Sequence, residues 1–130
     1  MKTKSKIFLA KIISKIITFF ISKNQTVIRN KINWSLNLDE GIDLSIFLFG
    51  SSEKKVLNFS KLLQKKNTPI IIIDIGANIG SVSLIMAKKL ENSKVFAIEP
   101  TNYAFQKLSK NLDLNDDLKD KIFLKQLFIS

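Results

Sequence analysis

The residues of this 130-residue chain whose types and spacing suit chemistry lie between Asp74 and Gly80, in the segment DIGANIG. Gly76 and Gly80 bracket a turn of three residues, and glycine allows backbone conformations and close approaches that a side chain would prevent. Asp74 places a carboxylate just ahead of the turn. A glycine turn between a buried strand and a helix is typical of a site that binds phosphate or a cofactor.

Three kinds of nucleotide or cofactor site compete for this segment. A P-loop needs Gly-Lys-Ser/Thr after its turn, but the residues after Gly80 are Ser-Val-Ser. A dinucleotide site needs a glycine where this chain has Asn78, whose side chain would stand in the way of the pyrophosphate. S-adenosylmethionine has no pyrophosphate, and its methionine part carries an ammonium, a carboxylate and a sulfonium group. The segment therefore favours S-adenosylmethionine.

Glu99 adds a second carboxylate, 25 residues after Asp74 and at the end of the next predicted strand. An acidic side chain there can accept hydrogen bonds from both ribose hydroxyls, in NAD sites and in S-adenosylmethionine sites alike. Together with Asp74 and the glycine turn, it favours S-adenosylmethionine. Simpler interpretations remain open, with Glu99 as a solvated carboxylate before Pro100 and Asp74 as the cap of the helix that follows.

The composition excludes several other chemistries. The chain has no cysteine and no histidine, so it has no disulfide, no thiolate nucleophile, no Cys/His zinc site and no imidazole acid–base catalyst. We expect no metal centre and assign no catalytic residue. The net charge of +10 is concentrated at one end, because residues 1–31 hold eight basic side chains and no acidic one. The rest of the chain is nearly balanced, which argues against a nucleic-acid partner.

The elements that must position these residues follow the order β-α-β-α-β. Four isoleucines and Asp-Ile in Ile70–Ile75 predict a parallel strand covered on both faces. The later predicted elements are a helix over Ser81–Leu90, a strand over Val95–Ile98, a helix capped by Asn102 and running through Leu114, and a strand over Lys121–Ile129.

Upstream of the glycine turn the pattern is less regular. Asn33–Leu38 alternates between polar and apolar residues and predicts a half-buried strand with Trp34 on its inner face. Ile42–Phe49 is an apolar segment of unassigned type. Glu53–Lys66 predicts a helix, with Ser51 or Ser52 as its N-cap.

Residues 1–23 predict a basic amphipathic helix. Its polar sector comprises Lys4, Lys11, Ser14, Lys15, Thr18 and Ser22, and apolar residues fill most of the remaining surface. Lys11 and Lys15 interrupt the apolar run, so we predict neither a signal peptide nor a membrane-spanning helix. Two interpretations remain open: the helix lies in an anionic membrane interface, or it packs on the surface of this chain or of a partner.

Two segments carry a resemblance to a known family. IIIIDIGANIGSVSL and KVFAIEPTNYAFQKLSKNLDLN resemble the FkbM-type family of class I S-adenosylmethionine-dependent methyltransferases. The resemblance implies that the turn wraps the methionine part of the cofactor and that Glu99 holds the ribose. The residues implied in the cofactor site are Asp74, Gly76, Ala77, Asn78, Gly80, Glu99, Pro100, Asn102, Tyr103 and, more weakly, Glu53. Glu53 is equally well interpreted as a carboxylate at a helix start.

The resemblance also implies an incomplete sheet. Family members continue through further strands that supply much of the acceptor pocket, and this chain holds only the first three. We therefore expect a partial Rossmann-like α/β fold, from a truncated or split protein, in which Ile70–Ile75 is an open edge. A missing C-terminal half or a partner chain would complete the sheet.

The predicted organisation has three regions: a basic amphipathic helix at 1–24, strand and helix elements at 25–67, and a partial S-adenosylmethionine-binding domain at 68–130. The function implied by the resemblance is methyl transfer to a hydroxyl of a sugar, a polyketide or another small or glycan acceptor. The alternatives are a non-catalytic cofactor-binding remnant and a membrane-peripheral binding module. We expect a cytoplasmic protein, with the membrane-peripheral alternative open.

Overall fold

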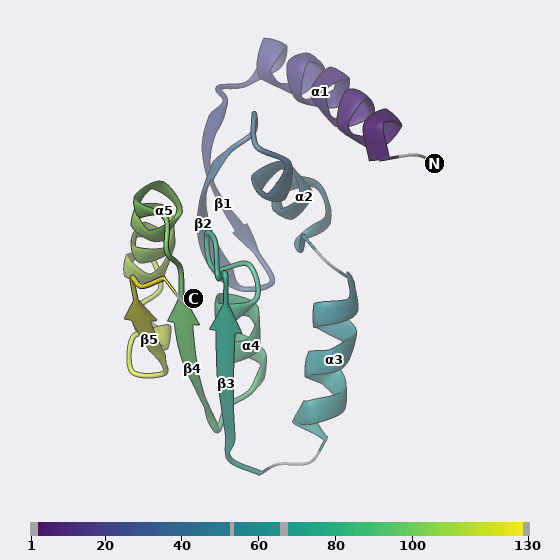
Figure 1. Cartoon of the computed structure of the whole chain (residues 1–130). Coiled ribbons are helices and arrows are strands. Elements are labelled where there is room, and N and C mark those ends of the chain that lie inside the picture. The colour runs from purple at the N-terminus through teal and green to yellow at the C-terminus, as the bar shows by residue number, and fades with distance from the viewer. Residues whose placement is uncertain (1–2, 53, 66–67, 129–130) are drawn as a thin grey trace.

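The computed structural model describes residues 3–52, 54–65 and 68–128 (Figure 1). The elements are α1 (Thr3–Phe20), β1 (Asn24–Arg29), β2 (Ile32–Asn37), α2 (Gly41–Phe49), α3 (Lys54–Gln64), β3 (Ile70–Ile75), α4 (Ser83–Lys89), β4 (Ser93–Ile98), α5 (Asn102–Asp113), the 3₁₀ helix η1 (Asp116–Leu118) and β5 (Ile122–Lys125). The predicted order β-α-β-α-β from residue 70 onward is confirmed.

Two separate sheets are present in the described part of the chain. β3, β4 and β5 form a parallel sheet in that order, with Ile72 opposite Val95 and Val95 opposite Ile122. β1 and β2 form an antiparallel hairpin. The half-buried strand predicted at 33–38 corresponds to β2, whereas β1 was not predicted from the sequence. Asn30 and Lys31, both with positive φ, make the turn between β1 and β2. This turn contains no glycine, so the sequence carries no clear signal for it.

β2 is held against α5 by side chains. Asn111 accepts a hydrogen bond at its Oδ1 from the Ser35 backbone amide at 2.8 Å, and Asn115 does the same for the Asn33 amide at 2.9 Å. Asp43 of α2 accepts the Asn37 amide at 2.7 Å. The strand edge that β1 leaves free is therefore satisfied by side chains rather than by another strand.

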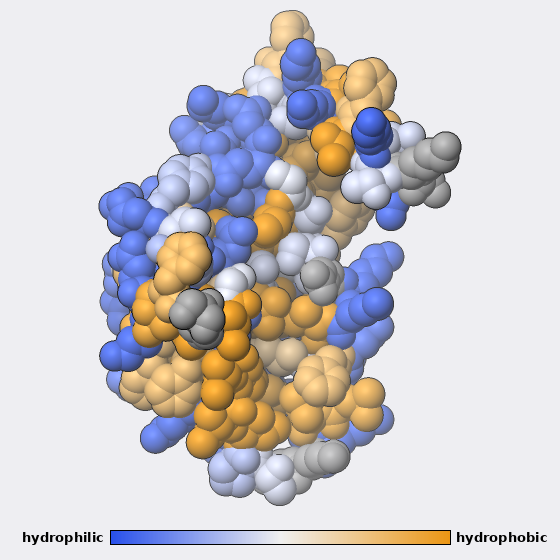
Figure 2. All heavy atoms as spheres, in the orientation of Figure 1, coloured by the Kyte–Doolittle hydropathy of each residue, from blue (hydrophilic) through white to orange (hydrophobic). Residues whose placement is uncertain are grey.

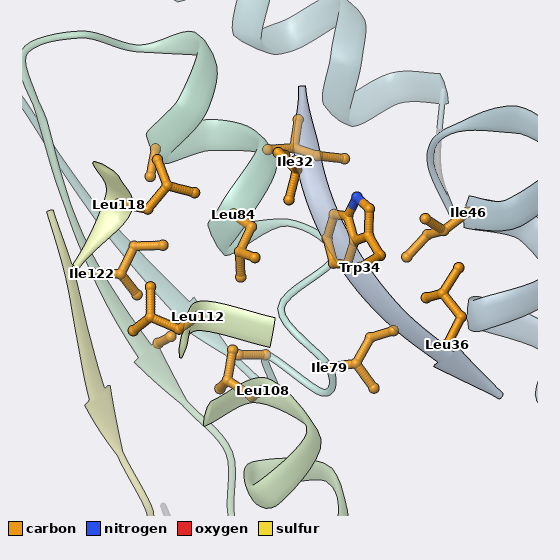
Figure 3. Packing of buried hydrophobic residues seen from close by; sticks show 14 of the residues in the cluster. Ile32, Trp34, Leu36, Ile46, Ile79, Leu84, Leu108, Leu112, Leu118 and Ile122 are labelled. Carbon is orange, nitrogen blue, oxygen red and sulfur yellow. The ribbon is translucent and has the colours of Figure 1, made fainter. Parts of the chain in front are cut away.

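One core joins the hairpin to the parallel sheet. Trp34, the largest buried side chain, packs within a cluster that draws residues from both parts of the chain (Figure 3). That cluster includes Ile32 and Leu36 of β2, Ile46 of α2, Ile79 of the glycine turn, Leu84 of α4, Leu108 and Leu112 of α5, Leu118 of η1 and Ile122 of β5. The residues around the turn are thus fixed by contacts that lie far away in sequence.

The prediction that β3 is covered on both faces was wrong. Ile70, Ile72 and Asp74 face α4 and are partly buried, but Ile71, Ile73 and Ile75 are 71%, 64% and 66% exposed. In the part of the chain that the structure describes, helices cover only one face of the sheet, and the other face shows as an apolar area in the lower half of Figure 2. An unbroken apolar strand indicates that burial of both faces would be favourable. It does not indicate that the described residues bury both.

Several element boundaries also differ from prediction. The segment Ile42–Phe49, whose type was unassigned, is helical and belongs to α2. Gly50, with a φ of 78° in the left-handed region, ends this helix. α4 begins two residues later than predicted, at Ser83, and β5 ends at Lys125 rather than 129. Thr101, not Asn102, is the N-cap of α5. Residue 53 and the predicted end of the helix at Lys66 lie outside the described residues.

The N-terminal segment forms the predicted helix, but Ser14 is not on its solvent side. Ser14 is 6% exposed and donates a hydrogen bond from Oγ to the Leu38 carbonyl at 2.8 Å. A hydroxyl is small enough to be buried once it finds a backbone acceptor, so a residue of the polar sector need not face solvent. None of the described helices is both long enough and apolar enough to cross a bilayer.

Candidate cofactor-binding site

The glycine turn lies at the carboxyl edge of the parallel sheet, where β3 ends beside β4. The backbone amides of Gly76 and Ala77 both donate to the Ile98 carbonyl, at 2.9 and 3.0 Å. Gly76, Asn78 and Gly80 have positive φ values of 78°, 51° and 90°. Asparagine tolerates the left-handed region better than most residues, which is a backbone reason for Asn78 beside its predicted binding role.

The two glycines meet different surroundings. A Cβ atom on Gly80 would lie under 3.0 Å from methyl carbons of Leu84 and Leu108, so this glycine is required by packing as well as by its φ. A Cβ atom on Gly76 would meet nothing within 4 Å. The space beside Gly76 is open, and a ligand can approach the backbone there.

Glu99 is the best-held polar side chain of the site. It is 5% exposed, and its Oε2 accepts the Asn78 amide at 2.9 Å. Its Oε1 accepts both the amide and the hydroxyl of Thr101, at 2.9 and 2.6 Å. Burial alone raises the pKa of Glu99, but the hydrogen bonds from Thr101 and Asn78 outweigh it, so the pKa lies below its usual value. Glu99 is thus ionised at neutral pH and links the turn to the end of β4.

Asp74 lies on the covered face of β3, where it accepts a hydrogen bond from the Ser83 hydroxyl at 2.6 Å. Burial raises the pKa of Asp74, the Ser83 hydrogen bonds oppose this, and repulsion from Glu99 adds a smaller increase. Ser83 is the first residue of α4. The contact supports the interpretation of Asp74 as an anchor for the start of that helix.

The residues after Glu99 begin α5 and turn toward the hairpin. The Tyr103 hydroxyl donates to Oε1 of Glu40, and Tyr103 remains 60% exposed. Tyr103 also lines a cavity of about 320 Å³ between β2 and α5, together with Ser35, Asn37, Lys107 and Lys110. The structure therefore brings Tyr103 beside β2, while Asn78 and Glu99 touch directly.

A buried ionic cluster beneath Tyr103 was missed by sequence reasoning. Lys107 contacts Asp43 at 2.6 Å and Glu40 at 3.1 Å. Asp43 is fully buried, and its Oδ1 has no partner among the described residues. Burial raises the pKa of Asp43, although Lys107 and the Asn37 amide oppose the shift. Lys107 and Asp43 are 64 positions apart in sequence, so no local pattern joins them.

Two further supporting residues were also missed: Ser83 and Asn111. Asn111 donates from Nδ2 to the Ile79 carbonyl at 3.0 Å, so the same side chain holds both the glycine turn and β2. Its only sequence signal is an asparagine on the apolar side of a predicted helix. Within the described residues, no cluster of acidic side chains is arranged to hold a metal ion. Glu53, the remaining predicted site residue, lies outside the described residues.

Comparisons with known proteins agree with this architecture. No family model matches the chain. Over 47 residues it is 49% identical to Methyltransferase sdnD of Sordaria araneosa, a stretch that is 36% of this chain and 18% of that protein. The SAM-dependent methyltransferase from Agrobacterium tumefaciens matches 80% of the chain with TM-score 0.60 at 11% identity, over 32% of its own length. TYW2 of M. jannaschii, solved in complex with AdoMet, matches 80% of the chain with TM-score 0.54 at 17% identity, over 43% of its length.

These likenesses define the fold. The chain has a partial Rossmann-like α/β fold of the kind found in class I methyltransferases, as predicted from the sequence. It spans about a fifth of the curated relative and less than half of the two structures. Membership of the FkbM-type family stays a prediction.

Proposed function

We propose that this chain is the cofactor-binding part of an S-adenosylmethionine-dependent methyltransferase. The observation that carries the proposal is the contact between the Glu99 carboxylate and the Asn78 amide. It joins the acid at the end of β4 to the positive-φ turn at the end of β3. This is the edge of a parallel sheet where α/β proteins bind their ligands. The relatives support the same function, since sdnD is named a methyltransferase and TYW2 was solved with AdoMet.

The hydrogen-bonding capacity of Glu99 fits a ribose. A carboxylate offers about four acceptor positions, and the protein uses two on Oε1 and one on Oε2. One position on Oε2 is therefore free for a hydroxyl. The Thr101 hydroxyl can rotate away from Oε1, while the Thr101 amide keeps the carboxylate in place. Glu99 can thus receive two hydroxyl donors and still be held by two backbone amides.

The remaining residues would hold the methionine end. Gly76 leaves its surroundings open, and the Ile98 carbonyl holds the turn in shape through two amides. Asp74 positions α4 through Ser83, and its negative charge beside the turn would favour the cofactor's ammonium group. When bound, S-adenosylmethionine supplies an electrophilic methyl group, and the protein's task is to align the acceptor and exclude water. By the FkbM-type resemblance, we propose a hydroxyl of a sugar, polyketide or other small molecule as acceptor.

We also propose that a further strand pairs with the open edge of β3. In the described residues β3 has only β4 as a neighbour, and its uncovered face is rich in isoleucine. A flat, apolar strand edge of this kind readily pairs with another strand. A C-terminal continuation or a partner chain would supply that strand, its covering helix and acceptor-binding residues.

Isothermal titration of the chain with S-adenosylmethionine and with NAD tests the cofactor assignment. We expect S-adenosylmethionine to bind and NAD to show no heat. Glu99→Gln should weaken binding at least about tenfold, because an amide cannot accept hydrogen bonds at both positions. Glu91→Gln, which changes an exposed acid on the opposite edge of the sheet, is the matched control. Binding of NAD alone, or equal affinity in both variants, would overturn the proposal.

The acceptor is tested separately. The chain, together with the continuation or partner chain that supplies the further strand, is incubated with S-adenosylmethionine carrying a labelled methyl group. It is offered a panel of sugars and polyketide alcohols and, for comparison, an RNA. Label in a small hydroxyl acceptor is the expected result. Label only in the RNA would contradict the acceptor class while leaving the cofactor assignment intact.

A further inference from the structure

The helix α1 is attached to the protein by one narrow side. Ser14 is buried against the Leu38 carbonyl, and Ala10 and Ile17 pack against the core cluster on the same side. These three positions are spaced by four and three residues, as one row on a helix requires. The attachment fixes which side of α1 points away from the protein.

The opposite side of α1 is apolar and uncovered. Phe8, Ile12, Ile16 and Phe19 are 67%, 40%, 56% and 83% exposed, and we call these four residues the outer face of α1. Their spacing of four, four and three places them in one row. α1 lies at one end of the molecule, well away from the parallel sheet and the glycine turn (Figure 1), so an object bound there would leave the cofactor edge free.

Lysines border the outer face. Lys11 lines the same surface hollow as Phe8 and Ile12, and Lys15 lines the same hollow as Ile16 and Phe19. Figure 2 shows hydrophilic and hydrophobic side chains side by side over this end of the molecule. No acidic residue occurs in residues 1–31. One acid from outside α1, Asp39, also lines the hollow of Phe8 and Lys11, and it lies 4.0 Å from the Lys23 ammonium group. The surface thus offers apolar area and positive charge together.

We propose that α1 binds the surface of an anionic membrane, with its outer face in the headgroup region. The combination of phenylalanines with a lysine border matches what such a surface provides: apolar depth beneath negatively charged headgroups. A protein groove would satisfy the apolar row but gives no reason for a border in which lysines outnumber the one acid, Asp39. The lysines also keep the helix parallel to the surface, since Lys11 and Lys15 lie in the middle of its length.

Sedimentation with vesicles tests this inference without reference to catalysis. The 130-residue chain should sediment with vesicles of phosphatidylcholine mixed with phosphatidylserine and remain in the supernatant with phosphatidylcholine alone. Raising the salt concentration should release it, because the charge contribution is screened. Equal binding to both kinds of vesicle, or none to either, would overturn the proposal.

Matched variants separate the two contributions. Replacing Lys4, Lys11 and Lys15 by Gln should weaken binding about a hundredfold. The same change at Lys54, Lys55 and Lys61, which are exposed on α3, removes equal charge and should change it much less. Phe19→Ser should weaken binding at least about tenfold, whereas Phe128→Ser, equally exposed at 83% near the C-terminus, should not.

All these side chains are exposed, so thermal unfolding should be unchanged in each variant. Loss of binding in the α3 variant as large as in the α1 variant would contradict a site on α1. If Phe19→Ser instead abolishes a concentration-dependent dimer seen by sedimentation equilibrium, while vesicle binding is unaffected, a second copy of the chain covers the outer face and the membrane proposal is wrong.

Discussion

β2 and β3 are both six-residue strands with alternating burial, yet they stand in opposite situations. In β2 the polar residues alternate with Ile32, Trp34 and Leu36, which are almost fully buried. In β3 every residue but Asp74 is isoleucine, and three of the isoleucines are about two-thirds exposed. The edges differ as well, because Asn111, Asn115 and Asp43 satisfy the free edge of β2, whereas no described strand or side chain does so for β3.

Among the described residues the two strands lack different things: β2 lacks a larger sheet, and β3 lacks cover on one face. β2 belongs to a small hairpin that would be marginal alone, and it is stabilised by α2, α5 and a shared core. β3 belongs to the sheet that carries the candidate site, and it is the strand with the most exposed apolar surface. The uncovered face of β3, beside the candidate binding turn, is the observation behind the proposal that a further strand pairs with β3.

The largest effect is expected where α2 and α5 are joined by charge. Lys107→Met removes the cation beside Asp43, which is fully buried. An unpaired buried carboxylate should cost about 3–5 kcal/mol of unfolding free energy. Urea unfolding followed by circular dichroism measures it, with Lys110→Met, an exposed lysine on the same helix, as control. If the double variant Asp43→Asn/Lys107→Met is no more stable than Lys107→Met, the charge is not the cause.

The same substitution in the two strands tests the comparison directly. Ile32→Ala opens a cavity in the core and should cost about 2–5 kcal/mol, since Ile32 is 0% exposed. Ile73→Ala, at 64% exposure, should cost less than about 1 kcal/mol. Chemical unfolding of both variants at two protein concentrations is the measurement. Equal losses of unfolding free energy that depend on protein concentration would mean that the exposed face of β3 is covered in solution.

The two glycines after β3 give an intermediate effect. Gly76→Ala forces a positive φ on alanine and should cost about 1–2 kcal/mol. Gly80→Ala has the same penalty and, in addition, overpacks Leu84 and Leu108, for about 1–3 kcal/mol more. Thermal unfolding ranks the variants, and titration with S-adenosylmethionine shows whether Gly76→Ala also weakens binding. A Gly80→Ala variant as stable as Gly76→Ala would argue against the packing role.

The smallest effect is the pH dependence of the two strand-end carboxylates, and the expected signs differ. The pKa of Glu99 lies below its ordinary value of 4.5, so Glu99 contributes stability above that pH which is lost as the pH falls through the lowered pKa. The pKa of Asp74 is raised above 3.8, so the folded state gains stability as the pH falls through the raised pKa. In urea unfolding across acidic pH, Glu99→Gln should flatten the acid loss and Asp74→Asn should steepen it. Parallel changes would show that the two groups titrate alike.

Much of the fold followed from local patterns. The β-α-β-α-β order, the alternation in β2 and the placement of Asp74 and Glu99 at adjacent strand ends were all predicted, because side-chain periodicity and glycine positions act over a few residues. The contact between Asn78 and Glu99 agrees with that placement. β1 was not predicted, since the residues of its turn fit more than one conformation. The type of α2 was not predicted either, because a uniformly apolar segment fits a strand as well as a helix.

The sequence by itself determined the turn, because Gly76, Asn78 and Gly80 are residues suited to positive φ. It also placed Asp74 and Glu99 at the ends of their strands. Only the tertiary structure decided which face of β3 is covered, that Ser14 is buried, and that Asn111 and the Lys107–Asp43 pair hold β2 to α5. The physical reason is range. Backbone conformation is set by neighbouring residues, whereas burial and ion pairing depend on which distant segments meet, and no short pattern carries that information.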